Sequence, residues 1–196
     1  MLSPRSHPHP AAHAPCGRIS RRLWLQQVAA FAACGLVGQA QAVALRDVEL
    51  VHLDGRRVRL LSQVWQDRTA LLNFVFTACT SFCGVQSAQL AALQERLRAH
   101  MGSALVFISI TLDPLTDSPE RLKTFAQPFG PGPHWWWLTG DPPRVFGVLE
   151  ALGADRGPPA DHSPFMLLGR PGQMQRIVGF PSLQTLESTV RQRLGA

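Results

Sequence analysis

The sequence contains few cysteines, and this scarcity excludes one class of protein. Only four of its 196 residues are cysteine, and Cys16 and Cys34 lie in an N-terminal segment ahead of the main part of the chain. Small secreted scaffolds depend on several disulfides, which a chain of this length does not need to hold a core. The remaining pair, Cys79 and Cys83, therefore calls for another explanation.

The main part of the chain also lacks a concentration of basic charge. The chain has 19 Lys and Arg against 13 Asp and Glu, but four of the arginines, and no acid, lie in residues 1–42. Residues 43–196 therefore carry a net charge of only +2. Because phosphate binding needs a stripe of Lys and Arg, we expect no nucleic acid among the partners.

The N-terminal segment has the features of an export signal. Two arginines follow Ser20, an apolar run covers Val28–Val37, and Ala40-Gln41-Ala42 provides the small residues that precede a cleavage site. The paired arginines resemble those of a twin-arginine signal. We therefore predict a signal peptide over residues 1–42, cleaved after Ala42, and a periplasmic mature domain over residues 43–196.

Two alternatives to cleavage remain. The segment could stay as an anchor that holds the domain on the periplasmic side of the membrane, although its apolar run is shorter than the roughly 20 residues of a spanning helix. Cys34 could instead be acylated.

Patterns typical of strands and helices alternate along the mature chain. Val48–Leu53 and Val58–Leu60 predict a hairpin across Asp54-Gly55, and the apolar runs Ala70–Phe76 and Leu105–Ile110 predict buried strands. Further strands are predicted over 165–168 and 176–180, and helices over 85–99, 118–129, 143–152 and 183–194. This order predicts an α/β domain with a thioredoxin-like fold, in which helices flank a central mixed β-sheet with an N-terminal β-hairpin.

Three consecutive tryptophans, Trp135-Trp136-Trp137, form the most unusual apolar segment. We expect part of this segment in the core and one or two indoles exposed as a docking surface.

Cys79 and Cys83 lie between a predicted buried strand and a predicted helix. If the helix begins near Cys79, the i, i+4 spacing places both sulfurs on one face, and the helix N-terminus favours thiolate over thiol. Thiolates bind soft metals and attack disulfides. The alternatives are two small core residues, an inert disulfide, or a redox pair with one more intervening residue than thioredoxins have.

His162 is the candidate third ligand of a metal site. It precedes the predicted strand at 165–168, whose start should lie beside the cysteines in a thioredoxin-like sheet. Two thiolates and an imidazole suit Cu(I), and with a further oxygen or nitrogen ligand they suit Cu(II). Structural zinc would want a fourth Cys or His. We interpret His52, His100 and His134 as ordinary surface or core residues.

Four blocks in order resemble the SCO/SenC family of copper-delivery proteins. They are Leu72–Thr77 running into Cys-x3-Cys, Ile110–Leu122 with its Asp-Pro and Asp-Ser-Pro-Glu, Leu138–Asp141, and Asp161–Ser163. The resemblance implies a thioredoxin-like fold that binds one copper ion through Cys79, Cys83 and His162. It also implies delivery of that copper to the binuclear copper centre of cytochrome c oxidase.

The resemblance suggests roles for two aspartates. Asp113 corresponds to a family aspartate near the site, where it would support the ligands or face a partner; otherwise it is a turn residue before Pro114. Asp161 would orient His162 or supply an oxygen ligand. Thr80 and Gly84 stand where relatives often have proline after each cysteine, a difference that removes no ligand.

Two functions follow from the same thiols. The first is a copper chaperone whose partners are the copper-bearing subunit of cytochrome c oxidase and, in addition, other periplasmic copper chaperones or thiol reductants. The second is a thiol-disulfide oxidoreductase that reduces the copper-ligand cysteines of the oxidase or of another exported protein. His162 distinguishes them, because copper binding uses it and disulfide exchange does not.

Overall fold

The computed structural model describes residues 45–154, 157–159 and 163–195. The predicted signal peptide, with Cys16 and Cys34, lies outside these residues. No helix among the described residues is long and apolar enough to cross a membrane.

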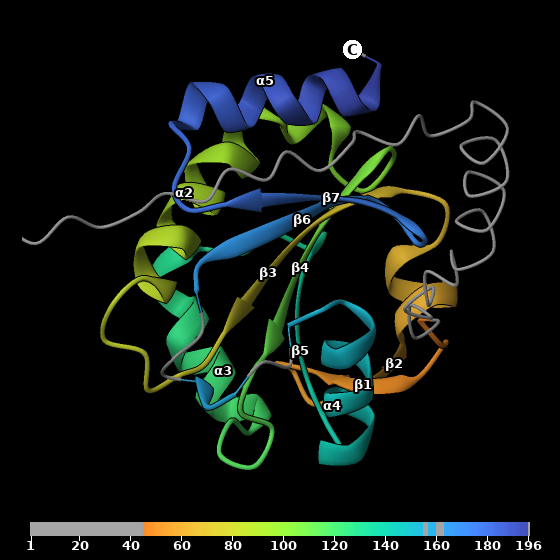
Figure 1. Cartoon of the computed structure of the whole chain (residues 1–196), viewed down its shortest axis with the longest axis vertical. Helices are drawn as coiled ribbons and strands as arrows, with labels where there is room; N and C mark the ends of the chain where they lie inside the picture. Colours follow the sequence, from red (N-terminus) through yellow and green to blue (C-terminus); the bar gives the residue numbers. More distant parts are fainter. Residues whose placement is uncertain (1–44, 155–156, 160–162, 196) are drawn as a thin grey trace, which may run out of the picture. The chain divides into compact units, whose positions relative to one another are not determined.

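The described residues build one mixed sheet (Figure 1). Its strands lie in the order β2-β1-β5-β4-β3-β6-β7. The three central strands β3, β4 and β5 are parallel, and β1 and β6 pair antiparallel on either side of them. The strand bounds are β1 (Glu49–His52), β2 (Arg57–Arg59), β3 (Thr69–Val75), β4 (Leu105–Thr111), β5 (Trp135–Thr139), β6 (Phe165–Arg170) and β7 (Gln173–Val178).

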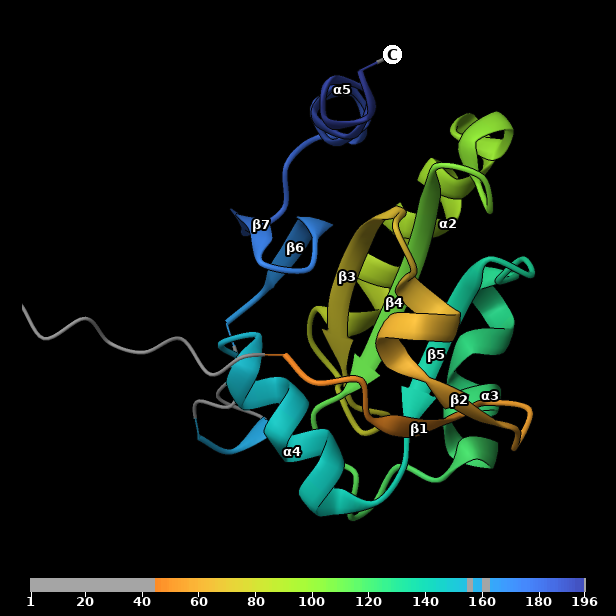
Figure 2. The same ribbon diagram turned by 90° about the vertical axis from the view of Figure 1, so that its right-hand side faces the viewer.

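Helices cover both faces of the sheet (Figure 2). One face packs against α2 (Cys83–Arg96), α3 (Pro119–Ala126) and α5 (Leu183–Leu194). The other packs against α4 (Pro142–Ala151) and a turn of π-helix at Leu60–Trp65. Short 3-10 turns at Arg98–His100 and Gln127–Phe129 follow α2 and α3.

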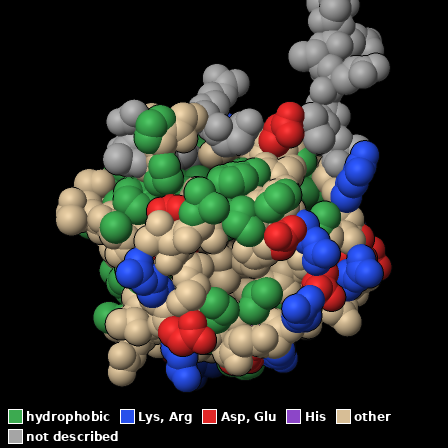
Figure 3. All heavy atoms as spheres, turned by 90° about the horizontal axis from the view of Figure 1, so that it is seen from below, with side chains coloured by type: hydrophobic (Ala, Val, Ile, Leu, Met, Phe, Trp, Pro, Cys, Tyr) green, Lys and Arg blue, Asp and Glu red, His purple; other side chains and the backbone are tan. Residues whose placement is uncertain are grey.

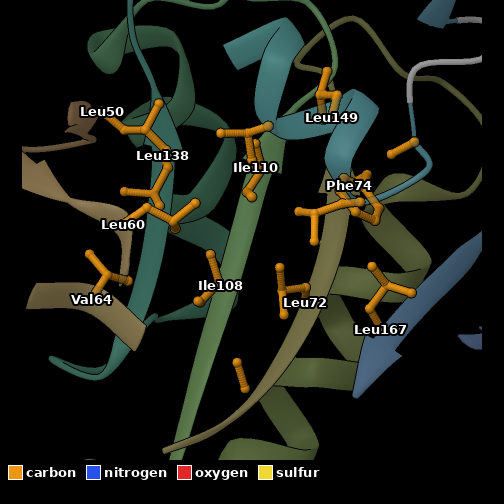
Figure 4. Close-up of a cluster of buried hydrophobic side chains, with 14 of the residues drawn as sticks. Leu50, Leu60, Val64, Leu72, Phe74, Ile108, Ile110, Leu138, Leu149 and Leu167 are labelled. Carbon is orange, nitrogen blue, oxygen red and sulfur yellow. The ribbon is translucent and has the colours of Figure 1, made fainter. Parts of the chain in front are cut away.

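Strands β3 and β4 are buried along their whole length, as their continuous apolar runs predicted. Side chains alternate between the faces, so Leu72 and Phe74 of β3 meet Ile108 and Ile110 of β4 on the α4 side (Figure 4). Leu71 and Val75 belong to the core on the α2 side.

The predicted α/β sheet, its N-terminal hairpin and the C-terminal helix over 183–194 are confirmed. Ser118, where the helix over 118–129 was predicted to begin, caps α3: its hydroxyl accepts a hydrogen bond from the Arg121 backbone N–H. The last strand lies a few residues earlier than predicted, at Gln173–Val178.

The three tryptophans lie partly in the core, as expected, but in an element that was not expected. They form strand β5, which the sequence patterns did not predict, between β1 and β4. Trp135 and Trp137 are only 1 % and 0 % exposed, so neither indole is available for docking. Trp136 is half-buried, and the Arg56 guanidinium lies 4.9 Å from its ring centre.

Candidate metal centre

Cys79 and Cys83 lie where the central strand β3 passes into helix α2. The strand ends at Val75, and the helix begins at Cys83 with Phe82 as its N-cap residue. The helix predicted over 85–99 therefore starts two residues earlier than predicted, but the condition considered above, a helix start near Cys79, is not met. Cys79 belongs to the loop, so the conformation of that loop, and not a helical turn, brings the two side chains together.

The two thiols are in contact but have different surroundings. Cys83 is 0 % exposed and packs into the core on the α2 side, whereas Cys79 is only partly buried. The Cys83 thiol donates a hydrogen bond to the Cys79 sulfur. The Ser81 hydroxyl lies 3.5 Å from the same sulfur. Cys79 is thus the thiol that a ligand or another protein can reach.

These surroundings separate the pKa values of the two thiols. Burial raises the pKa of Cys79, but hydrogen bonds from the Cys83 and Ser81 side chains and backbone outweigh it and lower the pKa to about 7. Burial, together with the hydrogen bond to Cys79, raises the pKa of Cys83 to about 12. Contrary to the expectation for both sulfurs, these surroundings favour a thiolate only at Cys79.

The other predicted ligand, His162, and its neighbour Asp161 lie outside the described residues. Within the described ranges, no three His, Cys, Asp or Glu side chains form a group that could hold a metal ion. Strand β6 begins at Phe165 and pairs antiparallel with β3, with Met166 opposite Asn73. It therefore begins at the end of the sheet where β3 leads into the cysteine loop.

The structure places Asp113 in the turn between β4 and α3. Its carboxylate accepts a hydrogen bond from the Thr116 backbone N–H, and its own N–H donates to the Thr111 hydroxyl. These contacts match the turn role that we considered for Asp113. Its role in supporting the metal ligands stays a prediction.

Asp117, four residues later, is the residue that sequence reasoning missed. Its carboxylate is buried and accepts hydrogen bonds from the backbone N–H and the hydroxyl of Thr77, which precedes Cys79 by two residues. A sequence signal existed, because Thr77 and Thr111 end neighbouring buried runs and would meet at one edge of a parallel sheet.

The other described histidines have ordinary environments, as expected. His52 is buried, with Nδ1 3.1 Å from the Trp137 carbonyl oxygen, and burial lowers its pKa. Nε2 of His100 lies 3.4 Å from the Arg191 guanidinium. The ring of His134 packs against Gly102.

Hydrophobic side chains surround the cysteine end of the sheet. Leu115, in the turn after β4, is 76 % exposed, and Val85 and Phe180 are also exposed. The Phe180 ring contacts that of Phe82 in the cysteine loop, at 6.4 Å between centres. Figure 3 views the molecule from this end and shows a group of hydrophobic side chains on its surface.

The SCO1/SenC family model matches residues 39–185, which is most of the chain. The chain belongs to the SCO1/SenC family. Among curated family relatives, an SCO1 protein homolog of Bacillus subtilis is 35% identical over 91 residues, 44% of each chain. An SCO2-like protein of Rickettsia felis is 29% identical over 132 residues, 62% of each chain. The chain thus matches about half the length of these relatives.

Solved structures of SCO1/SenC relatives confirm the predicted thioredoxin-like fold. Copper-bound Sco1 of yeast matches with a TM-score of 0.65 at 21% identity, covering 79% of this chain and 94% of its own. BsSco, a Sco-family cytochrome c oxidase assembly protein in which a disulfide switch was identified, matches with a TM-score of 0.64 at 23% identity. That match covers 79% of this chain and 95% of BsSco.

Proposed function

We propose that this chain carries copper as its cargo, held by Cys79, Cys83 and His162, and delivers it to the copper-bearing subunit of cytochrome c oxidase. One observation in the structure carries the proposal: a partly exposed thiol with a pKa of about 7 contacts a second thiol at the end of the sheet. Thiolates are soft donors and suit Cu(I). Copper-bound relatives from yeast and Bradyrhizobium japonicum support the choice of metal.

His162 completes the proposed ligand set. Its imidazole would supply a nitrogen donor, which matters most for Cu(II) because Cu(II) favours nitrogen and oxygen ligands in higher coordination. Asp161 would orient that imidazole or add an oxygen donor. The start of β6 at the cysteine end of the sheet supports this assignment.

Delivery requires contact with a protein that accepts the ion. The exposed side chains of Val85, Leu115 and Phe180 at the cysteine end are apolar, and such side chains favour protein contacts. BsSco is described as a cytochrome c oxidase assembly protein. We therefore name the oxidase subunit as the acceptor, and other periplasmic copper chaperones or thiol reductants as further partners.

The proposal also includes the compartment in which the chain delivers copper. Residues 1–42 would direct the chain to the periplasm and be removed after Ala42, with membrane anchoring of an uncleaved chain as the alternative. Export would bring the cysteines to the compartment where they need a reductant, since the periplasm is oxidising.

Copper stoichiometry tests the proposal. We expect one Cu(I) per reduced chain, and none after Cys79 and Cys83 are joined in a disulfide, because the disulfide removes both thiolates. The variants Cys79→Ser and Cys83→Ser should each lose tight binding, and His134→Ala, which changes a histidine remote from the cysteines, should not. Equal copper uptake by the oxidised and reduced chains would reject the ligand set.

The second candidate is a thiol-disulfide oxidoreductase, favoured by the separated pKa values of the two thiols. The Cys79 thiolate would attack a target disulfide to form a mixed disulfide and release one target thiol. Cys83, after losing its proton, would then attack Cys79, forming the Cys79–Cys83 disulfide and releasing the second target thiol. A dithiol reductant would restore the pair.

A further inference from the structure

Asp117 holds a buried carboxylate between the ends of the central strands. The residue is 2 % exposed. Its Oδ1 accepts from the Thr77 hydroxyl at 2.6 Å, its Oδ2 accepts from the Thr111 hydroxyl at 2.6 Å, and the Thr77 N–H lies 3.1 to 3.2 Å from both oxygens. No Lys, Arg or His in the described part of the chain forms an ion pair with it. A buried charge that is held only by neutral donors is costly unless those donors are fixed in place.

The backbone of Asp117 is held independently of its carboxylate. Its carbonyl oxygen accepts from the Thr139 hydroxyl at 2.7 Å, at the end of β5, and its N–H donates to the Asp113 carbonyl at 2.8 Å. Asp117 is thus attached to the end of β4 through its carboxylate and to the end of β5 through its backbone carbonyl. From there the carboxylate reaches across to Thr77, beyond the end of β3. Of the three parallel strands, β3 is the one that leads into the cysteine loop.

We propose that Asp117 is a positioning residue that fixes the entry of the cysteine loop, and so sets how closely the Cys79 sulfur approaches that of Cys83. Thr77 has both its N–H and its hydroxyl bound to the carboxylate, and the Cys79 N–H donates to the Phe76 carbonyl at 3.1 Å. The chain between the strand end and Cys79 therefore has little freedom. The expected effect of Asp117 on copper binding rests on the proposed function.

A matched pair of threonine variants separates positioning from general stability. Thr77→Val removes one hydrogen bond to the Asp117 carboxylate, and Thr139→Val removes one hydrogen bond to its backbone carbonyl. Both changes replace a hydroxyl by a methyl group of similar size. Asp117→Asn removes the charge and part of the acceptor capacity, and Thr77→Ser keeps both donors and serves as the conservative variant.

Two measurements on the reduced, purified chain read out the geometry of the thiols. The first is Cu(I) affinity, measured by competition with a chelator. The second needs no copper: it is the equilibrium in which oxidised glutathione takes up the two hydrogens of the Cys79 and Cys83 thiols, giving the intramolecular disulfide and two reduced glutathiones. Thermal unfolding of each variant shows that it is folded at the temperature of measurement.

We expect Asp117→Asn and Thr77→Val to weaken Cu(I) binding roughly tenfold, as loss of a group that orients metal ligands typically does. The disulfide equilibrium should shift by a similar factor, because the two thiols meet less often. Thr139→Val and Thr77→Ser should stay within about twofold of the unchanged chain in both measurements. If Asp117→Asn does not fold, Thr77→Val decides.

Two results would overturn the proposal. One is a folded Thr77→Val whose copper affinity and disulfide equilibrium both stay within about twofold of those of the unchanged chain. The other is an equal loss in both valine variants, which would show that only general stability is at stake. If the unchanged chain binds no Cu(I), the copper function is rejected, and the glutathione equilibrium alone still decides the role of Asp117.

Discussion

The thiol of Cys83 donates a hydrogen bond to the sulfur of Cys79. This contact gives different pKa values to two thiols that look equivalent in the sequence. Cys79 accepts hydrogen bonds at the edge of the core, which stabilises its thiolate. Cys83 is enclosed by apolar side chains, which destabilise the Cys83 thiolate. A partly exposed nucleophile therefore lies next to a buried partner, an arrangement that serves copper binding and disulfide exchange equally.

The first prediction concerns the pH dependence of alkylation in the reduced, metal-free chain. Because the pKa of Cys79 is lowered to about 7, its alkylation rate should rise as pH increases and reach half its maximum near pH 7. Cys83, with its pKa raised to about 12, should stay largely protonated and unreactive below that pH. Mass spectrometry of peptides after short iodoacetamide pulses measures both rates.

Two variants control this experiment. Cys79→Ser should remove the fast reaction entirely. Cys83→Ser should keep it, since a serine hydroxyl also donates a hydrogen bond to the Cys79 sulfur. Equal alkylation rates at both cysteines across the pH range would contradict the asymmetry.

The second prediction concerns a hydrogen-bonded chain inside the sheet. The Trp135 Nε1–H donates to the Ser109 hydroxyl at 2.9 Å, and that hydroxyl donates to Asn73 Oδ1 at 2.6 Å. Ser109→Ala leaves a buried donor and a buried acceptor unpaired, so the free energy of unfolding should fall by about 1 to 3 kcal/mol. Urea unfolding measures it, with the exposed Ser103→Ala as the control.

This polar chain also illustrates what the sequence could not predict. The continuous apolar runs of β3 and β4 predicted two buried strands, and their burial on both faces confirms it. Strand β5 also carries a continuous apolar run, Trp135–Leu138, but its three tryptophans were interpreted as a core segment with a docking surface and not as a strand. In the structure both faces of this strand are covered, and Trp135 is held by a hydroxyl from the neighbouring strand.

Only part of the candidate site, too, could be predicted from the sequence. The spacing of Cys79 and Cys83 and their place after a buried strand identified the pair. The position of the helix start depends on loop geometry that spacing alone does not determine. Asp117 escaped notice because its hydrogen bond to Thr77 joins residues 40 positions apart. Such a contact exists only once the strands are aligned.

The third prediction tests a close approach in the outer hairpin. Gly169, in β6, has a φ of +148°, and a Cβ atom there would lie 2.1 Å from the Gln173 carbonyl oxygen. Gly169→Ala must therefore shift the backbone of the hairpin, and we expect a loss of about 3 kcal/mol in the free energy of unfolding. At Gly55, a Cβ atom would have open space around it. Gly55→Ala should therefore lower the free energy of unfolding by about 1 kcal/mol, because of the positive φ alone. Similar losses in both variants would exclude the steric explanation.

The fourth prediction concerns processing. If residues 1–42 are a cleaved signal, N-terminal sequencing of the periplasmic protein should begin at Val43. Replacing Ala40 and Ala42 by bulky residues should block cleavage, because signal peptidases require small residues at these positions. A full-length chain in the membrane fraction would favour the anchored alternative, and a lipid on Cys34 would favour acylation.

The last prediction separates copper delivery from thiol exchange. His162→Ala removes the proposed imidazole ligand and leaves both thiols in place. Cu(I) should bind more weakly but should not be lost, because two thiolates can still hold it, whereas Cu(II) binding should suffer more. Reduction of a disulfide substrate should continue at its normal rate, because the exchange uses only Cys79 and Cys83. His100→Ala, which changes a histidine beyond the C-terminal end of α2, opposite the end that adjoins the cysteine loop, is the matched control.

Copper loading of the oxidase in cells then decides between the two functions. If the chain delivers copper, His162→Ala should leave the oxidase without its copper while thiol exchange stays normal in the same purified variant. If the chain acts only as a reductase, the oxidase should load normally in His162→Ala and fail in Cys79→Ser. Normal loading in His162→Ala would reject delivery through this histidine and leave the reductase as the better account, because the separated thiol pKa values would then be the property that cells use.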